Sequence, residues 1–562
     1  MGVMKNIRDL VTELNRCLWK RLVLFFVLTM VAILINGYHY GTFDQVFHIP
    51  FFKAYQDPTH YPNDPFLQLK DYHFSYFWSL FIPAYRAGLF EPALFVTHVL
   101  VTFATFWAFW ELCETMFHNP TANVLMTLAL VFPHLGFPGF QIIEFSLLNR
   151  TFAIPFLLLA LSLYFRKRYF WSALLIGLMF NIHLVYTAFV IALIGMDLFL
   201  NIKRLEWKRL IPAFLIFGLL FTPMFMQKQG VAPGFDFTLR PELARLESSS
   251  TLYTVYYPVG PQPYLLVSTL QGLACAAIVL MSMRYHPKPE TDNTMRSFLI
   301  AIAIAITVGS LAAWFLPVTF IIQFQMIRIG VFLLYFAYLY FAYLIAKTLE
   351  SEPIQDWFKL LLVFTYVAVI FPLIPLVIWS LRNTKLRKIS ATATIASILV
   401  MAALEIGGAT VADLFSPGIH IYGLKSDWRS AQDWARENTA TDTMFITPPY
   451  IFWHYESDWR VFSERGTVVT ICESMELHYD PTFTSAYVTR MNDIAPSAIE
   501  KFNGNYYDTF RYTQEAFETL DDADFSRLAQ KYVVDYLVLP NQTPSDFPIV
   551  YHNPSYSIYQ LN

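Results

Sequence analysis

Long apolar stretches alternate with short polar connections over the first three quarters of the chain. The stretch 22–35 contains no charged residue, and similar stretches recur up to residue 411. About 20 such residues cross the hydrocarbon core of a bilayer as a helix. We therefore predict a polytopic α-helical membrane protein with about 11–13 transmembrane helices. After the first, the predicted spans are 92–112, 121–139, 150–165, 171–183, 184–200, 210–226, 263–283, 297–316, 329–345, 360–381 and 390–411.

The pattern changes near residue 420. The segment 427–438 has apolar residues at helical spacing, and 525–531 does as well. The segments 443–447 and 532–539 are short, apolar and β-branched, and a terminal hairpin turns at Asn553-Pro554. The sequence therefore predicts two parts, a transmembrane domain over residues 1–415 and a small soluble α/β domain over residues 420–562.

Composition excludes several classes of protein. Hydrophobic residues make up 56% of the chain and charged residues 14%, whereas soluble domains carry roughly 25% charged residues. A soluble enzyme, a disordered scaffold and a disulfide-stapled secreted module are therefore excluded. The four cysteines show no metal-type spacing.

Charge is distributed unevenly along the chain. From residue 425 onward there are 20 acidic and 10 basic side chains, a net charge of −10. This acidic tail argues against a nucleic-acid partner, whose phosphates require clustered Lys and Arg.

Basic loops indicate the orientation, because basic flanks stay in the cytoplasm. The first apolar stretch follows a basic N-terminus and lacks a small-residue cleavage site, so we expect an uncleaved helix with its N-terminus in the cytoplasm. The clusters at 166–168 and 203–209 then lie inside, and the loops at about 37–73 and 231–262 lie outside. The basic cluster 382–388 lies in the cytoplasm only if the chain crosses the membrane once more before it, and we expect this additional crossing within 297–345. The acidic tail is then extracytoplasmic.

The first outer loop is the richest in candidate chemistry. Within 29 residues it holds three carboxylates and three histidines: Asp44, Asp57, Asp64, His39, His48 and His60. Asp57 and Asp64 each precede a proline, so turn formation explains them as well as function does. Asp44 lacks a following proline, and we expect Phe43 and Phe47 to reduce its hydration and raise its proton affinity. It is the preferred candidate for a general base, in a pocket closed by His48, Asp57 and the second outer loop.

A divalent metal could bind these histidines and carboxylates, but the spacings match no metal motif. The sequence therefore predicts no certain cofactor.

Ionisable residues in or beside membrane spans are costly and indicate function by default. Arg150 and Arg328 begin spans and could each hold a lipid-linked phosphate. Glu144 could pair with Arg150, His183 could be a buried hydrogen-bonded histidine, and Arg240 belongs to a polar segment that could either gate a lipid pocket or simply connect two helices.

These residues together resemble the membrane glycosyltransferases of the GT-C superfamily. The resemblance rests on the Asp-bearing first loop and on the motifs at 149–155, 181–183, 427–438, 443–449, 462–465 and 531–540. It is similar to a bacterial branch with a C-terminal extracytoplasmic domain. No Asp-x-Asp pair occurs at Asp44 and no Trp-Trp-Asp motif in the tail, so the protein-mannosyl and oligosaccharyl branches are not indicated.

The resemblance implies an inverting glycosyltransferase in a bacterial inner membrane, which takes a sugar from a polyprenyl-phosphate donor. The acceptor, a glycan or a protein, would approach from outside, with Asp44 as catalytic base. Besides the donor, membrane lipids are the expected partners. Two alternatives stay open, a non-enzymatic subunit of an envelope or secretion assembly and a transporter.

Overall fold

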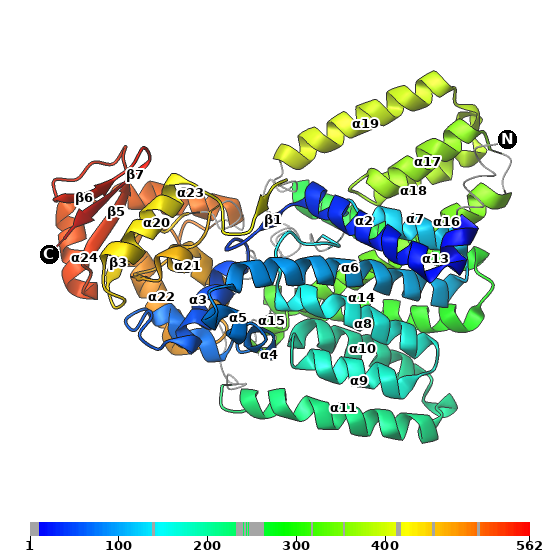
Figure 1. The fold of residues 1–562 in the computed structure, drawn as a ribbon, viewed down its shortest axis with the longest axis horizontal. Coiled ribbons are helices and arrows are strands. Elements are labelled where there is room, and N and C mark those ends of the chain that lie inside the picture. The colour runs from blue at the N-terminus through cyan, green and yellow to red at the C-terminus, as the bar shows by residue number, and fades with distance from the viewer. Residues whose placement is uncertain are drawn as a thin grey trace.

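The computed structural model describes residues 11–135, 137, 141–231, 240, 243, 246, 263–315, 319–351, 354–411, 417–451, 456–502 and 506–561. A bundle of helices and a C-terminal α/β domain lie next to each other along the longest axis (Figure 1). The predicted fold class is therefore confirmed. The second predicted outer loop, 231–262, falls almost entirely outside the described residues.

Five stretches of helix among the described residues are long and apolar enough to cross a membrane. They are α2 (Leu18–Asn36), α6 (Phe90–Phe117), α11 (Trp207–Lys228), α14 (Pro289–Phe315) and the stretch that ends in α16 (Gly330–Ser351). Further apolar helices of the bundle are α8 (Asn149–Phe165), α9 (Tyr169–Phe180), α10 (Leu184–Leu200), α13 (Pro263–Ser282), α18 (Leu373–Ser380) and α19 (Ala391–Val411).

Helix α16 forms the centre of the bundle, and its residues from Gly330 to Ile345 are all buried. Three of its tyrosines, Tyr338, Tyr340 and Tyr343, find polar partners there, which a polar group within a membrane needs. The Tyr338 hydroxyl lies 2.7 Å from His134 Nδ1, and the Tyr340 hydroxyl donates to Asp292 at 2.9 Å. Helices α13 and α14 pack against it, and Phe109 of α6 lies edge-on to its Tyr335.

Two predicted spans are not single crossing helices. Among the described residues of the span predicted at 121–139, the helix is α7 (Pro120–Ala129), and 360–381 is divided into α17 (Asp356–Ala368) and α18 by a turn that contains Pro372. The Leu135 amide donates to the Ile370 carbonyl at 3.0 Å, so the segment that follows α7 contacts this turn. Proline ends a helix because it lacks an amide hydrogen and clashes with the preceding turn.

Helices α17 and α18 form a hairpin whose two ends lie together. Trp379 in α18 donates to Thr348 near the end of α16 at 2.9 Å, and Thr394 at the start of α19 donates to the Trp357 carbonyl. The basic segment 382–388 therefore lies at the same end as the start of α17. The extra crossing expected within 297–345 is not needed, because the hairpin accounts for the charge pattern.

The C-terminal domain contains a five-stranded sheet in the order β4-β3-β5-β7-β6. Strand β3 (Met444–Ile446) is parallel to β4 (Gly466–Thr467) and to the central β5 (Tyr536–Pro540), whereas β7 (Tyr556–Gln560) is antiparallel to β5 and to β6 (Ile549–His552). Helix α20 (Asp427–Asn438) buries Trp428 against this sheet. The predicted helix at 427–438, the strand at 443–447 and the terminal hairpin are present, whereas the strand predicted at 532–539 begins only at Tyr536, since Tyr532 still belongs to α24 (Asp522–Tyr532).

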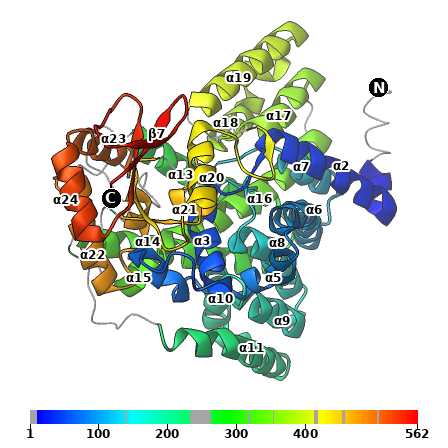
Figure 2. The same cartoon turned by 60° about the vertical axis from the view of Figure 1, so that its left-hand side comes forward.

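The C-terminal domain lies at the end of the bundle where the first loop begins (Figures 1 and 2). Strand β1 (Tyr38–His39), directly after α2, is parallel to β2 (Ile419–His420), directly before the domain. Helix α8 begins at this end and reaches Arg166 about 25 Å away, at 1.5 Å per residue. The loop 166–168 therefore lies at the opposite end, as the sequence predicts.

Candidate functional site

A polar cavity of about 170 Å³ lies where the first loop, the ends of several helices and the C-terminal domain meet. Its charged lining comes from all three parts of the chain: Asp44, Arg150, Lys228, Arg328 and Glu476. His48, His73 and His183 line it as well. Typical ligand sites begin near 300 Å³, so this cavity suits a small group rather than a whole glycan.

Arg150 is the most tightly held group of the cavity. It lies in the first turn of α8, with 3% of its side chain exposed, and forms an ion pair with Asp44. Its Nε and a terminal nitrogen also donate to the two Glu144 oxygens at 2.8 and 2.7 Å. The guanidinium lies 5.4 Å from the centre of the Phe43 ring. The sequence anticipated the Glu144–Arg150 pair, but the contact with Asp44 joins residues 106 positions apart.

Asp44 precedes α3 (Gln45–Gln56) and differs from expectation in its electrostatics. Burial by itself would raise its pKa, but the positive charges of Arg150 and Arg328 outweigh burial, so the pKa of Asp44 is lowered. The expected increase in proton affinity from Phe43 and Phe47 is therefore wrong for this state of the protein. Asp44 is a carboxylate that is paired with a guanidinium.

Two further cations and a capping histidine line the cavity. Arg328 belongs to a short turn of 3₁₀ helix, η4 (Met326–Ile329), and Lys228 at the end of α11 donates to the Tyr72 carbonyl at 2.5 Å. His183 precedes α10, where its Nδ1 accepts the Tyr186 amide at 3.1 Å. The sequence analysis missed Lys228, although a lysine at the end of a span was the available signal.

A carboxyl–imidazole contact forms the opposite side of the cavity. Glu476 Oε2 lies 3.1 Å from His73 Nε2, and Phe51 stacks on the His73 ring with centroids 4.7 Å apart. Burial raises the pKa of Glu476 to about 8 and lowers that of His73 to about 3. Both groups are thus predominantly neutral at pH 7. Sequence reasoning missed both, because the two are about 400 positions apart.

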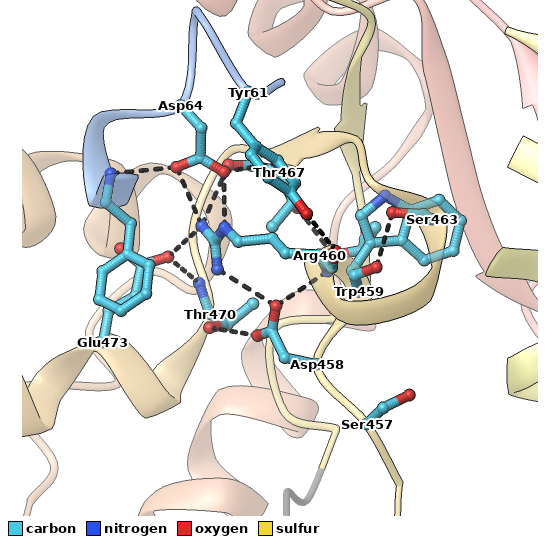
Figure 3. A network of polar contacts seen from close by, with 12 residues as sticks. Tyr61, Asp64, Ser457, Asp458, Trp459, Arg460, Ser463, Thr467, Thr470 and Glu473 are labelled. Carbon is cyan, nitrogen blue, oxygen red and sulfur yellow. Dashed lines mark hydrogen bonds and ion pairs between the residues drawn. The ribbon is translucent and has the colours of Figure 1, made fainter. Parts of the chain in front are cut away.

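Asp57 and Asp64 do not line the cavity. Asp57 accepts the Thr59 amide at 2.9 Å and the Thr59 hydroxyl at 2.7 Å, which is its turn-forming role. Asp64 is buried against Arg460 of the C-terminal domain, with contacts of 2.5 and 3.2 Å (Figure 3). These positions correct the expected grouping of both residues with Asp44, because each is already used by the fold.

Glu144 positions the Arg150 guanidinium through the two hydrogen bonds that it accepts, and it lines a separate small cavity. Arg240 is exposed, in a stretch of which only a few residues are described. Among the described residues, no group of three or more His, Cys, Asp and Glu side chains could hold a metal ion. Arg150 stands between the carboxylates of Asp44 and Glu144, so this pair does not fit a metal site.

Comparison with known proteins adds the following. Residues 426–494 match the model of a domain of unknown function, DUF6798. No curated protein sequence matches the chain significantly. Among solved structures, an apo oligosaccharyltransferase from Archaeoglobus fulgidus is similar in fold, with 12% identity and a TM-score of 0.47, over 92% of this chain and 69% of that one.

Two further structures from the same organism are similar. The oligosaccharyltransferase AglB in complex with an inhibitory peptide and a dolichol-phosphate has 12% identity and a TM-score of 0.45, over 93% of this chain and 70% of that one. The complex with Zn and sulfate has 13% identity and a TM-score of 0.47, over 92% and 67%. All three are structures of oligosaccharyltransferases.

Proposed function

We propose that this protein is a glycosyltransferase that takes a sugar from a polyprenyl-phosphate donor and transfers it to an acceptor at the extracytoplasmic face. The observation that carries the proposal is the charge of the polar cavity. Three cations, Arg150, Lys228 and Arg328, line it together with Asp44, while Glu476 is predominantly protonated at pH 7. An excess of positive charge at the end of a helical bundle suits the phosphate of a lipid-linked sugar.

The donor phosphate would bind between Arg150 and Arg328. It would compete with Asp44 for the Arg150 guanidinium, so Asp44 would lose its partner at the moment when the donor is in place. The proton affinity of a buried carboxylate rises when a neighbouring cation is withdrawn. Asp44 would therefore become a base only in the loaded enzyme.

In the transfer step, the acceptor oxygen forms a bond to the sugar C1 while the bond from C1 to the phosphate oxygen breaks. Asp44 takes the acceptor's proton, and the electron pair leaves with the lipid phosphate, which is a stable anion held by the arginines. Attack opposite the leaving phosphate inverts the configuration at C1.

In the proposed orientation, the N-terminus is cytoplasmic, and the cavity and the C-terminal domain face outward.

The test compares two aspartates of the first loop. Asp44→Asn keeps the shape and removes the base, so turnover of a polyprenyl-phosphate sugar should fall by roughly 10²–10⁴-fold. Asp57→Asn, at an exposed turn, is the matched control and should retain full transfer.

Donor binding is measured separately with a polyprenyl phosphate. Arg328→Gln should weaken it, whereas Asp44→Asn should not, because it frees Arg150. If Asp44→Asn retains full transfer, Asp44 is not the base. If no sugar transfer occurs in the unmodified protein and polyprenyl phosphate does not bind, the function as a whole is rejected in favour of a non-enzymatic assembly role.

A further inference from the structure

A second hollow of about 180 Å³ adjoins the polar cavity. It lies between α3, α4 (Tyr76–Ser79) and the start of α5 (Ile82–Arg86), and we call it the aromatic pocket. His48, His73, Phe74 and Ser75 line both hollows, so the two share a wall. A ligand in the aromatic pocket would lie directly beside the group bound in the polar cavity.

The lining of the aromatic pocket differs sharply from that of the polar cavity. Its described lining residues include no Asp, Glu, Lys or Arg. The two histidines of the shared wall are neutral, because burial lowers the pKa of both His48 and His73 to about 3. The pocket is therefore built for an uncharged ligand, whereas its neighbour is built for an anion.

Aromatic rings alternate with polar groups around this pocket. Phe51, Phe52, Tyr55, Phe74 and Trp78 supply ring surface, and Gln56 and Ser79 supply an amide and a hydroxyl. The C–H groups of a pyranose ring pack on the electron-rich faces of aromatic rings, while its hydroxyls require donors and acceptors. A plain hydrocarbon chain would pack on the aromatic rings but would form no hydrogen bonds with the amide and the hydroxyl.

Trp78 provides an independent indication of a polar ligand. Its side chain lines the pocket with 6% of the residue exposed, and its indole N–H has no hydrogen-bond partner among the described residues. A buried donor without an acceptor is costly, on the order of 1–3 kcal/mol. The N–H is itself buried in this state, so a ligand hydroxyl oxygen would satisfy it once the surrounding side chains move apart.

We propose that the aromatic pocket binds a neutral sugar ring, which is the acceptor of the transfer. Its acceptor role rests on the function proposed above, whereas the binding itself does not. A sugar held there would extend a hydroxyl past His48 toward Asp44 in the polar cavity. The acceptor class is thus an uncharged glycan or glycoside.

The test uses the full-length protein in a sugar-free detergent. A panel of neutral methyl hexopyranosides is titrated while tryptophan fluorescence is followed, with a methyl hexuronoside as the charged counterpart. At least one neutral glycoside should bind saturably, and the hexuronoside should bind more weakly. Trp78→Phe keeps a smaller aromatic ring and removes the N–H, so it should weaken binding by about tenfold, the loss expected for one buried hydrogen bond.

Control variants separate this site from the polar cavity. Trp107→Phe, at a tryptophan of α6 that is 44% exposed, should leave the affinity unchanged. Ser79→Leu, at the exposed rim, should reduce binding without disturbing the core. Arg328→Gln should weaken polyprenyl phosphate binding and leave glycoside binding intact.

The possible outcomes are distinct. Binding of the glycoside without transfer would retain this site and reject the proposed function. Phosphate binding without any glycoside binding would overturn this inference alone. Equal binding of the hexuronoside, tighter binding of long-chain alcohols than of glycosides, or unchanged affinity in both Trp78→Phe and Ser79→Leu would also overturn it.

Discussion

At the scale of single residues, Arg460 shows how one guanidinium joins the two parts of the protein. It is 1% exposed and contacts Asp64 of the first loop and Asp458 and Glu473 of its own domain (Figure 3). Asp64 also accepts the Thr467 amide at 3.1 Å. Removing one member of a buried pair costs more than the pair contributes, because the remaining charge is left uncompensated.

Asp64→Asn should therefore destabilise the protein by about 3 kcal/mol. The measurement is thermal unfolding of the detergent-solubilised protein. Arg511→Gln, which removes an exposed ion pair with Glu515, is the control and should leave the midpoint nearly unchanged. Equal decreases of the unfolding midpoint in the two variants would show that the Asp64–Arg460 contact does not stabilise the protein.

Glu476 should make stability depend on pH. Folding raises its pKa from 4.5 to about 8, so the folded protein binds this proton more tightly than the unfolded chain. The resulting stabilisation is complete below pH 4.5 and is lost as the pH rises to 8. Glu476→Gln removes the titration, so the wild-type midpoint should fall relative to that of the variant between pH 5 and 8.

Glu500→Gln, at an exposed glutamate of the same domain, should follow the wild type through this range. His73, His478, Asp44 and Arg328 also face Glu476 and contribute to its environment. Parallel midpoint curves for Glu476→Gln and the wild type would contradict the raised pKa.

At the scale of elements, the apolar pattern located the helices but not their lengths. Hydropathy alone does not distinguish a crossing helix from α17 and α18, because both halves of that hairpin are as apolar as a span. The turn at Pro372 was visible in the sequence, yet a proline inside a membrane helix more often causes only a kink. The contact of this turn with residues 134 and 135, which sets its depth, depends on the tertiary fold.

Gly41 connects the first loop to the C-terminal domain through close packing. Its φ is +80°, and a Cβ there would lie 2.9 Å from the Phe462 ring. Gly88 has a similar φ of +69°, but nothing lies within 4 Å of its Cβ position. Gly41→Ala should therefore be more destabilising than Gly88→Ala, since both incur the backbone strain of about 1 kcal/mol and only Gly41→Ala adds a clash. Thermal midpoints of the two variants test this; equal losses would show that Phe462 yields freely.

At the scale of the whole molecule, the charge pattern predicts that the C-terminal domain and the loop 166–168 lie on opposite sides of the membrane. A cysteine at Glu437, which is 68% exposed on its side chain, should react with a membrane-impermeant maleimide in intact cells. A cysteine at exposed Arg168 should react only after permeabilisation. The native Cys113, Cys275 and Cys472 are buried, and Cys17 is replaced by serine as background control. The reverse pattern would invert the proposed orientation.

The candidate site was only partly predictable from the sequence. Asp44, Arg150, Arg328, His48 and His183 stood out because charged and polar groups near spans are rare, and they do line one cavity. Glu476 could not be found in this way, because acidic residues are common in the tail. The pairing of Asp44 with Arg150 lowers the proton affinity of Asp44 instead of raising it. The sequence shows which residues are neighbours along the chain, but not that Arg150 lies beside Asp44 in space.

The contact between Asp64 and Arg460 has a consequence for biosynthesis. The two residues are 396 positions apart, and ribosomes add about 5–20 residues per second. Arg460 is therefore synthesised roughly 20–80 s after Asp64 of the first loop. During that time the loop's carboxylate and aromatic side chains lack the surface that later covers them. A nascent chain stopped before residue 460 would never gain the partner of Asp64, so this part of the first loop would stay uncovered.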